Sequence, residues 1–224
     1  MTPPGISPYK ISKDLEEKAK EARQKKEQLD SILPEYKKTN DILLSHGIEK
    51  FKETFKKIED LYNEKKYLDA YDEFTKIKDE MDAELKKLRK NLIDYNKKFI
   101  EKFISMGYDL SSFENDLENA PQNIEDFLSY LKDFNIKLRK EIKNLLNNKI
   151  SPIDSETKLK LLETYGKQID AIDSLPEKDI ESLIESIKKE VTEYYMKKIN
   201  VEMERIDKLR NLFDKMKIST TNFK

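Results

Sequence analysis

Apolar residues recur every three or four positions along most of this chain, and charged residues fill the positions between them. In an α-helix this spacing gathers the apolar side chains on one face. The pattern is most regular in two long runs, from Leu68 to Met106 and from Ile180 to Met216. We expect each run to form one helix, the first about 60 Å long at 1.5 Å per residue.

The start of the chain carries a weaker apolar stripe. It follows Ser12, which suits the N-cap of a helix running to about Leu33. Pro34 should end this helix and begin the next, because proline is tolerated at the first helical position and not in the interior. The next helix is expected to run past Gly47 to Tyr62. The prolines and glycine before Ser12 predict an extended arm over residues 1–11, and the patternless residues 219–224 predict a frayed tail.

Two serines mark expected helix starts further along the chain. Ser111 and Glu114 have the spacing of a capping box. Ser151 is expected to cap another helix, with Pro152 at its first position. That helix should pack through a set of apolar residues: Leu159, Leu162, Ile169, Ile172 and Leu175.

Two kinds of marker recur along the chain with nearly the same period. Three of the four glycines are about 60 residues apart, each in a helical pattern that a break follows: Gly47, Gly107 and Gly166. The hairpin tips are about 55 residues apart, at Asn63 to Lys66, Pro121 and Pro176. Such a period predicts helical hairpins. We place them at residues 34–90, 90–149 and 152–218 of one body that spans residues 12–218.

The expected fold is therefore all-α: an elongated, coiled-coil-like antiparallel bundle of repeated hairpins with six or seven helices. A helix shared between successive units resembles the tandem bundles of spectrin, as an analogy of architecture alone. The tryptophan typical of that family is absent, and the repeat here is shorter.

Composition supports long helices over a layered core. Charged residues make up 40% of the chain and hydrophobic residues 37%, with no cysteine and no tryptophan. The apolar residues include 10 phenylalanines and 11 tyrosines. These can bury enough area to distinguish the chain from a disordered polar tract. The lack of cysteine excludes disulfides, thiolate nucleophiles and cysteine-based metal sites.

Motifs for catalysis are missing from the sequence. There is no glycine-rich phosphate loop, zinc-protease motif or nucleophile elbow. The single histidine, His46, lies near a helix end, where bonding to a free carbonyl is a more ordinary role than that of metal ligand or general base. Carboxylate groups such as Asp69, Asp72 and Glu73 suit a solvated face with ion pairs to lysines, because a di-metal bundle would also need histidines. We expect no enzyme activity, no metal and no cofactor.

Charge is unevenly distributed although 44 basic and 45 acidic residues nearly cancel. Residues 109–126 contain acids and no base, whereas other stretches are mainly basic. Helix dipoles explain part of this, since acids favour first turns and bases favour last turns. The part of the uneven charge that dipoles do not explain predicts hairpins with acidic tips and basic helical shafts, which bind a partner or a second copy. The candidate surface comprises Asp109, Glu114, Asp116, Glu118, Lys86, Lys87, Arg89, Lys90, Lys97 and Lys98.

The sequence favours a non-catalytic scaffold or adaptor that binds protein partners or copies of itself. The alternative is a protein that uses lysines to bind nucleic acid or an anionic membrane surface. A contiguous exposed apolar patch on a long helix would favour the first function, and a one-sided stripe of lysines the second. We see no signal peptide and no membrane-spanning run, so the expected location is the cytoplasm.

Overall fold

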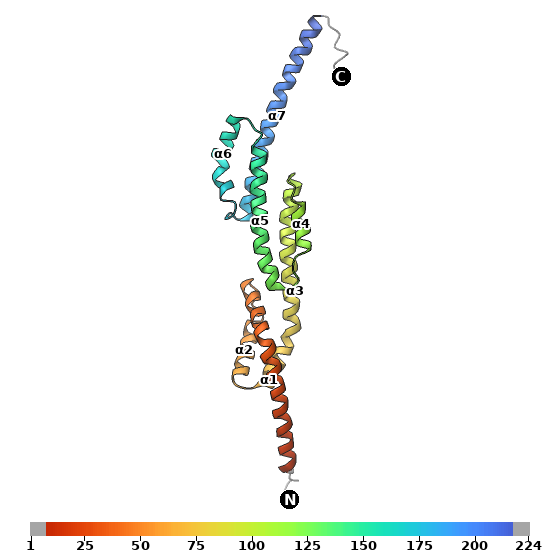
Figure 1. The fold of residues 1–224 in the computed structure, drawn as a ribbon, viewed down its shortest axis with the longest axis vertical. Helices are drawn as coiled ribbons and strands as arrows, with labels where there is room; N and C mark the ends of the chain where they lie inside the picture. Colours follow the sequence, from red (N-terminus) through yellow and green to blue (C-terminus); the bar gives the residue numbers. More distant parts are fainter. Residues whose placement is uncertain (1–7, 217–224) are drawn as a thin grey trace. The chain divides into compact units, whose positions relative to one another are not determined.

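The structure, a computed structural model, describes residues 8–216. These residues form seven α-helices and no strand (Figure 1). The expected all-α class is confirmed, and the packing of the helices is consistent with a bundle. The chain divides into two compact units, Met1–Asn96 and Lys97–Lys224, and we describe each by itself.

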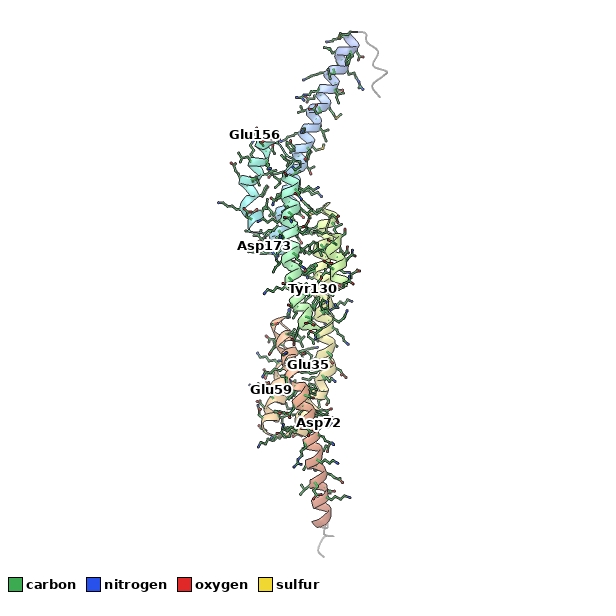
Figure 2. All side chains as sticks on the ribbon, in the orientation of Figure 1. Glu35, Glu59, Asp72, Tyr130, Glu156 and Asp173 are labelled. Atoms are coloured by element: carbon green, nitrogen blue, oxygen red, sulfur yellow. The ribbon has the colours of Figure 1, made fainter. Side chains whose placement is uncertain are left out.

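The first unit contains α1 (Pro8–Ser45), α2 (Lys52–Asn63) and most of α3 (Tyr67–Ser105). Apolar side chains from all three helices meet in its core, while charged residues such as Glu35 and Asp72 are exposed on the outside (Figure 2). The core is formed by Leu29, Tyr36, Leu43, Phe51, Phe55, Ile58, Ala70, Phe74, Ile77, Met81 and Leu88.

Helix α1 corrects two of our predictions. Residues 8–11 are helical instead of extended, because Pro8 occupies the first turn, where proline costs no helical hydrogen bond; residues 1–7 lie outside the described residues. Pro34 lies inside α1 and does not end it. An internal proline costs a helix about 3 kcal/mol. Burial of Leu29 before it and Leu43 after it offsets this cost, since both are completely buried in the same core.

Three helices in the described chain end in the same way, with one residue in the left-handed region of backbone conformation. Gly107 (φ 88°) follows α3, as predicted, whereas Gly47 (φ 78°) follows α1 and ends a helix that we expected to run past it. Lys65 (φ 61°) takes this position after α2. Each is followed by a backbone bond of the Schellman type, such as Ile48 N donating to Leu43 O at 2.9 Å.

Lys65→Gly should stabilise the first unit by about 0.5–1 kcal/mol. A lysine Cβ is strained at positive φ, and glycine removes that strain at some cost in unfolded-state entropy. Urea unfolding followed by circular dichroism will measure the change. Gly47→Ala is the reciprocal variant and should destabilise the unit; a Lys65→Gly protein no more stable than wild type would contradict this reading of the turn.

The second unit contains the end of α3, then α4 (Ser111–Glu118), α5 (Ile124–Ile150), α6 (Ser155–Asp170) and α7 (Glu177–Lys215). Helices α5, α6 and α7 pack against one another. The core of this unit includes Phe103, Leu117, Phe127, Phe134, Leu138, Ile142, Leu146, Leu161, Ile169, Ile172, Ile180, Ile184 and Ile187. The predicted division into hairpins over residues 34–90, 90–149 and 152–218 stays a prediction, and the predicted tail at 219–224 lies outside the described residues.

The capping residues differ from those we predicted. The Ser111 side chain does not cap α4; Asp109 Oδ1 accepts hydrogen bonds from Ser111 N at 3.2 Å and Ser111 Oγ at 2.9 Å. Ser151 follows the end of α5 and does not begin α6, whose N-cap is Asp154, accepting from Thr157 N at 3.0 Å. At α6 a carboxylate, the stronger acceptor for free helix N–H groups, takes the capping role assigned to a serine, whereas the N-cap of α4 is Leu110, which makes no side-chain cap bond.

Gly166 lies in the interior of α6, inside a helical pattern as expected, and the helix ends four residues later at Asp170. A Cβ built there meets nothing within 4 Å. Gly166→Ala should therefore stabilise the second unit by about 0.5–1 kcal/mol, since alanine loses less backbone freedom in a helix. Thermal unfolding will test this. A destabilised Gly166→Ala variant would mean that a neighbour is closer to the glycine than described.

Candidate interaction surface

The second half of α7 carries the largest group of exposed apolar residues in the described chain. We call residues 195–216 the distal segment. It continues past the ends of α5 and α6 (Figure 1), and all its residues except Phe213 are exposed. Its large apolar side chains are 40–61% exposed: Tyr195, Met196, Ile199, Val201, Met203, Ile206, Leu209, Leu212 and Met216.

Most of these side chains share one face of the helix. Tyr195, Ile199, Met203, Ile206 and Leu209 follow one another at steps of three or four residues. The same face runs back toward the start of α7, where it is buried. The covered part is formed by Ile180, Ile184 and Ile187. One continuous apolar stripe is therefore covered by the rest of the unit in its first half and uncovered in its second.

A surface groove of about 420 Å³ lies where the covered part of the stripe ends. Its lining includes Val191 and Tyr195 of α7, and Met106 and Tyr108 from the turn after α3. Burial raises the pKa of the Tyr108 phenol above its ordinary value. The Lys149 ammonium lies 5.8 Å from the centre of the Tyr108 ring. The groove is mainly apolar and joins the exposed face of the distal segment.

Two of the four acidic residues in the predicted binding surface make contacts within the second unit. Asp109 holds the start of α4, and its bonds to Ser111 lower the pKa of its carboxyl group. Glu118 Oε1 pairs with Lys97 Nζ at 2.9 Å. Asp116 is exposed and Glu114 is half-buried. The structure therefore joins one predicted acid to one predicted base.

The basic candidates all belong to α3. Lys86, Lys87, Arg89 and Lys90 lie in the part of α3 that belongs to the first unit, and Lys97 and Lys98 in the part that belongs to the second. At 100° per residue, Arg89, Lys90 and Lys97 fall within about 60° of Lys86 around the helix, and Lys87 and Lys98 fall about 100–120° from it. Some of this charge is paired, since Lys87 Nζ lies 3.8 Å from Glu84 on the same helix.

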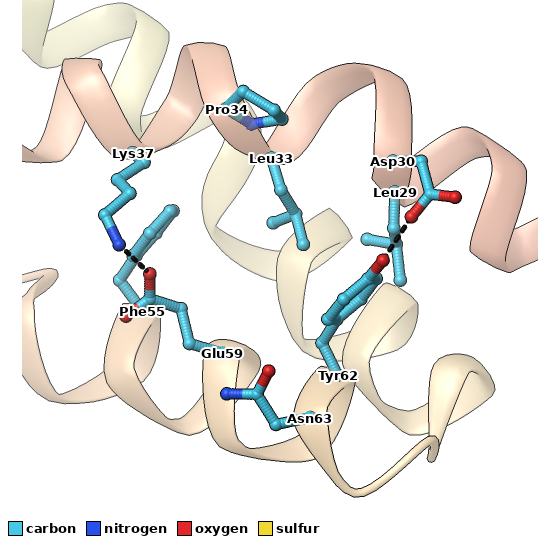
Figure 3. A pocket seen from close by; sticks show the side chains of 9 residues that line it. All are labelled: Leu29, Asp30, Leu33, Pro34, Lys37, Phe55, Glu59, Tyr62 and Asn63. Carbon is cyan, nitrogen blue, oxygen red and sulfur yellow. Dashed lines mark hydrogen bonds and ion pairs between the residues drawn. The ribbon is translucent and has the colours of Figure 1, made fainter.

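A second groove, also of about 420 Å³, lies between α1 and α2 in the first unit (Figure 3). Lys37 Nζ pairs with Glu59 Oε1 at 2.7 Å on one side of it. The Tyr62 hydroxyl donates to Asp30 on the other side, and Leu33 lies between the two pairs (Figure 3). The four polar groups of these pairs are thus bound to one another in two separate places, on opposite sides of Leu33.

Tyr36 is the most perturbed phenol of the first unit. It is buried, and its hydroxyl donates to the two Asp82 carboxylate oxygens at 2.8 and 2.9 Å. Burial, followed by the bond to Asp82, raises the pKa of Tyr36 above its ordinary value of 10.0. The folded state therefore favours the protonated phenol.

This raised pKa predicts a loss of stability at alkaline pH. Below pH 10 the phenol is protonated in both states; above it, only the unfolded chain releases the proton, so stability falls as pH rises toward the folded-state pKa. Tyr36→Phe should be less stable at pH 7 by about 1 kcal/mol and should lose less stability above pH 10. Urea unfolding at pH 7 to 11 will compare the two proteins; equal slopes would contradict the prediction.

His46 has the role expected of a histidine at a helix end. Its Nδ1 lies 2.9 Å from the carbonyl oxygen of Ile42, in the last turn of α1. In the part of the chain that the structure describes, no three histidine, aspartate or glutamate residues are grouped so that they could hold a metal ion. Within the same residues, no helix combines the length and the apolar character needed to cross a membrane.

Comparison with known proteins gives no relative of this chain. No protein-family model, no curated protein and no solved structure matches it. The apolar pattern predicts the stripe of the distal segment as part of a long helix. It does not predict that this half of the stripe is uncovered, because periodicity is the same for a covered and an uncovered face.

Proposed function

We propose that this protein is a non-catalytic helical adaptor that binds a protein partner through the apolar face of the distal segment. The observation that carries the proposal is the exposure of that face along 22 residues that continue a buried stripe. Exposed apolar stripes of this kind are typical of helices that pair with another helix. A partner would extend the packing that α5 and α6 begin.

Charge and cavities support an adaptor over the other functions we considered. Binding of nucleic acid or an anionic membrane is favoured by an excess of basic charge. Here 44 basic residues are balanced by 45 acidic ones, and Lys87 and Lys97 of α3 pair with Glu84 and Glu118. Catalysis would be favoured by an enclosed site with converging polar groups, and both grooves described above are open at the surface.

A photo-crosslinking experiment in cells that naturally produce the protein will test this proposal. The crosslinking amino acid benzoylphenylalanine is placed at position 206 on the apolar face, or at position 204 on the opposite face as a control. A partner seated on the face should give a crosslinked protein adduct from position 206 and little from position 204.

The mass of the adduct separates two forms of the proposal. An adduct of twice the chain mass indicates a second copy, and any other protein mass indicates a different partner; both support binding through this face. Equal adducts from the two positions, or no adduct from position 206, would overturn the proposed function.

A further inference from the structure

We propose that the partner of the distal segment is a second copy of the same segment, paired antiparallel about Ile206. This inference rests on the proposed function and names its partner. Its support is the order of charged and apolar residues along the exposed face. That order is nearly symmetric about Ile206, so the face complements itself when it is reversed.

Two charged residues interrupt the apolar stripe of the distal segment. Glu202 precedes Ile206 by four residues and Arg210 follows it by four. At 100° per residue, the two lie about 40° to either side of Ile206 around the helix. In an antiparallel pair centred on Ile206, each Glu202 comes level with Arg210 of the other copy. The pairing therefore brings opposite charges together twice.

The apolar residues follow the same symmetry. Met203 and Leu209 each lie three residues from Ile206, so they come level across the pair. Met196 and Met216 each lie ten residues from it and come level at the two ends. These side chains are 54–61% exposed in the single chain. Covering them gives the pair its main stabilisation, since removal of apolar surface from water drives association.

A parallel pair would place like charges together. Glu202 would face Glu202, because both would lie at the same height on the apolar face. Arg205 of one copy would approach Arg210 of the other across the edge of a parallel coiled coil. Like charges at these positions oppose pairing. The charge order thus favours the antiparallel arrangement.

Glu202 is available for such an exchange of partners. In the single chain it accepts a hydrogen bond from Arg205 at 2.7 Å, three residues along the same helix. Both side chains are more than half exposed, 54% for Glu202 and 67% for Arg205. An exposed ion pair of this kind contributes little to stability. Pairing can therefore redirect Glu202 without loss of core packing.

The pair should be reversible. A segment of 22 residues is about 33 Å long, which gives an interface at the small end of specific protein contacts. We expect a Kd on the order of micromolar. Sedimentation equilibrium of the full chain over a range of concentrations will measure it.

The first test compares two glutamate substitutions in apolar residues of similar exposure. Ile206→Glu places two carboxylates at the centre of the pair and should weaken association at least about 100-fold, leaving a monomer at micromolar concentration. Val201→Glu lies on the opposite side of the helix and should leave association unchanged. Circular dichroism will check that both variants keep wild-type helix content.

The second test determines orientation and uses the absence of native cysteine. Single cysteines are placed at positions 206, 196 and 216, and disulfide formation is measured under mild oxidation. In the antiparallel pair, Ile206→Cys should crosslink to itself. Met196→Cys and Met216→Cys should crosslink only when the two proteins are mixed. Self-crosslinking of each protein alone at all three positions would indicate a parallel pair and overturn the arrangement.

The third test concerns the ion pair. Glu202→Arg and Arg210→Glu should each weaken association, and the double variant should restore it. A double variant no stronger than the single ones would contradict the proposed register. A wild-type chain that is monomeric at about 100 μM would overturn self-pairing altogether. The adaptor proposal would then survive if position 206 crosslinks to a different protein in cells, so the two failures are distinguishable.

Discussion

Leu161→Ala should lower the free energy of unfolding of the second unit by about 2–5 kcal/mol, whereas Leu159→Ala should change it by less than about 0.5 kcal/mol. The two leucines lie on the same helix, α6, two residues apart. Leu161 is 0% exposed and Leu159 is 59% exposed. Removing the buried side chain loses its transfer free energy and leaves a cavity, while removing the exposed one does neither.

Urea unfolding followed by circular dichroism will measure the two leucine variants. Because the chain has two units, we expect the transition of the second unit to move to lower urea concentration in Leu161→Ala. The transition of the first unit should stay in place in both variants. Similar losses of stability for Leu161→Ala and Leu159→Ala would contradict the packing of α6.

Arg139→Met should destabilise the second unit by about 1–3 kcal/mol. The Arg139 guanidinium donates from Nη1 to the carbonyl oxygens of Ile172, at 2.8 Å, and Leu175, at 2.6 Å. These carbonyls belong to the connection between α6 and α7, where no helical N–H follows to satisfy them. Hydrogen bonds from a charged donor are the stronger kind, and the loss would leave partly buried carbonyls without this partner.

Two further substitutions control for the loss of charge and of geometry. Lys140→Met removes the charge of the exposed neighbouring residue and should change stability by less than about 0.5 kcal/mol. Arg139→Lys keeps the charge with a single ammonium in place of the fork, so we expect a loss between those of the other two variants. If Lys140→Met costs as much as Arg139→Met, the effect is one of overall charge and not of the two carbonyl bonds.

The two long helices could be predicted from the sequence because their patterns repeat over many turns. The runs Leu68 to Met106 and Ile180 to Met216 become α3 (Tyr67–Ser105) and α7 (Glu177–Lys215), within a few residues. The helix end at Gly47 was not predicted, because the apolar pattern continues past it. Gly107 predicted a helix end for a local reason, since glycine tolerates the positive φ that such an end requires. These features depend on residues close together in the chain.

Features that depend on tertiary packing could not be predicted in this way. Pro34 is a local signal for a helix end, and burial on both sides of it overrides that signal. Of the residues expected to pack from this part of the chain, Ile169 and Ile172 are buried, whereas Leu159 and Leu162 are exposed. Leu161, which was not in the expected set, is buried in their place.

The candidate surface shows the same limit. Charge runs identified residues such as Asp109 and Lys97, which the structure uses within the second unit, in hydrogen bonds to Ser111 and in an ion pair. The role of Arg139 could not be predicted, because backbone carbonyls as partners leave no sequence signal. The distal segment was identified as helical, and only coordinates could tell that its apolar face lacks a covering element within the described unit.

The half-covered helix α7 also has a consequence for the lifetime of the chain in the cell. A helical segment without tertiary contacts opens with little cost, whereas one held against a neighbour opens rarely. Proteases cut the open form, so dilute chains should be trimmed near residue 195 faster than concentrated ones. The abundance of the protein would then govern its own rate of degradation.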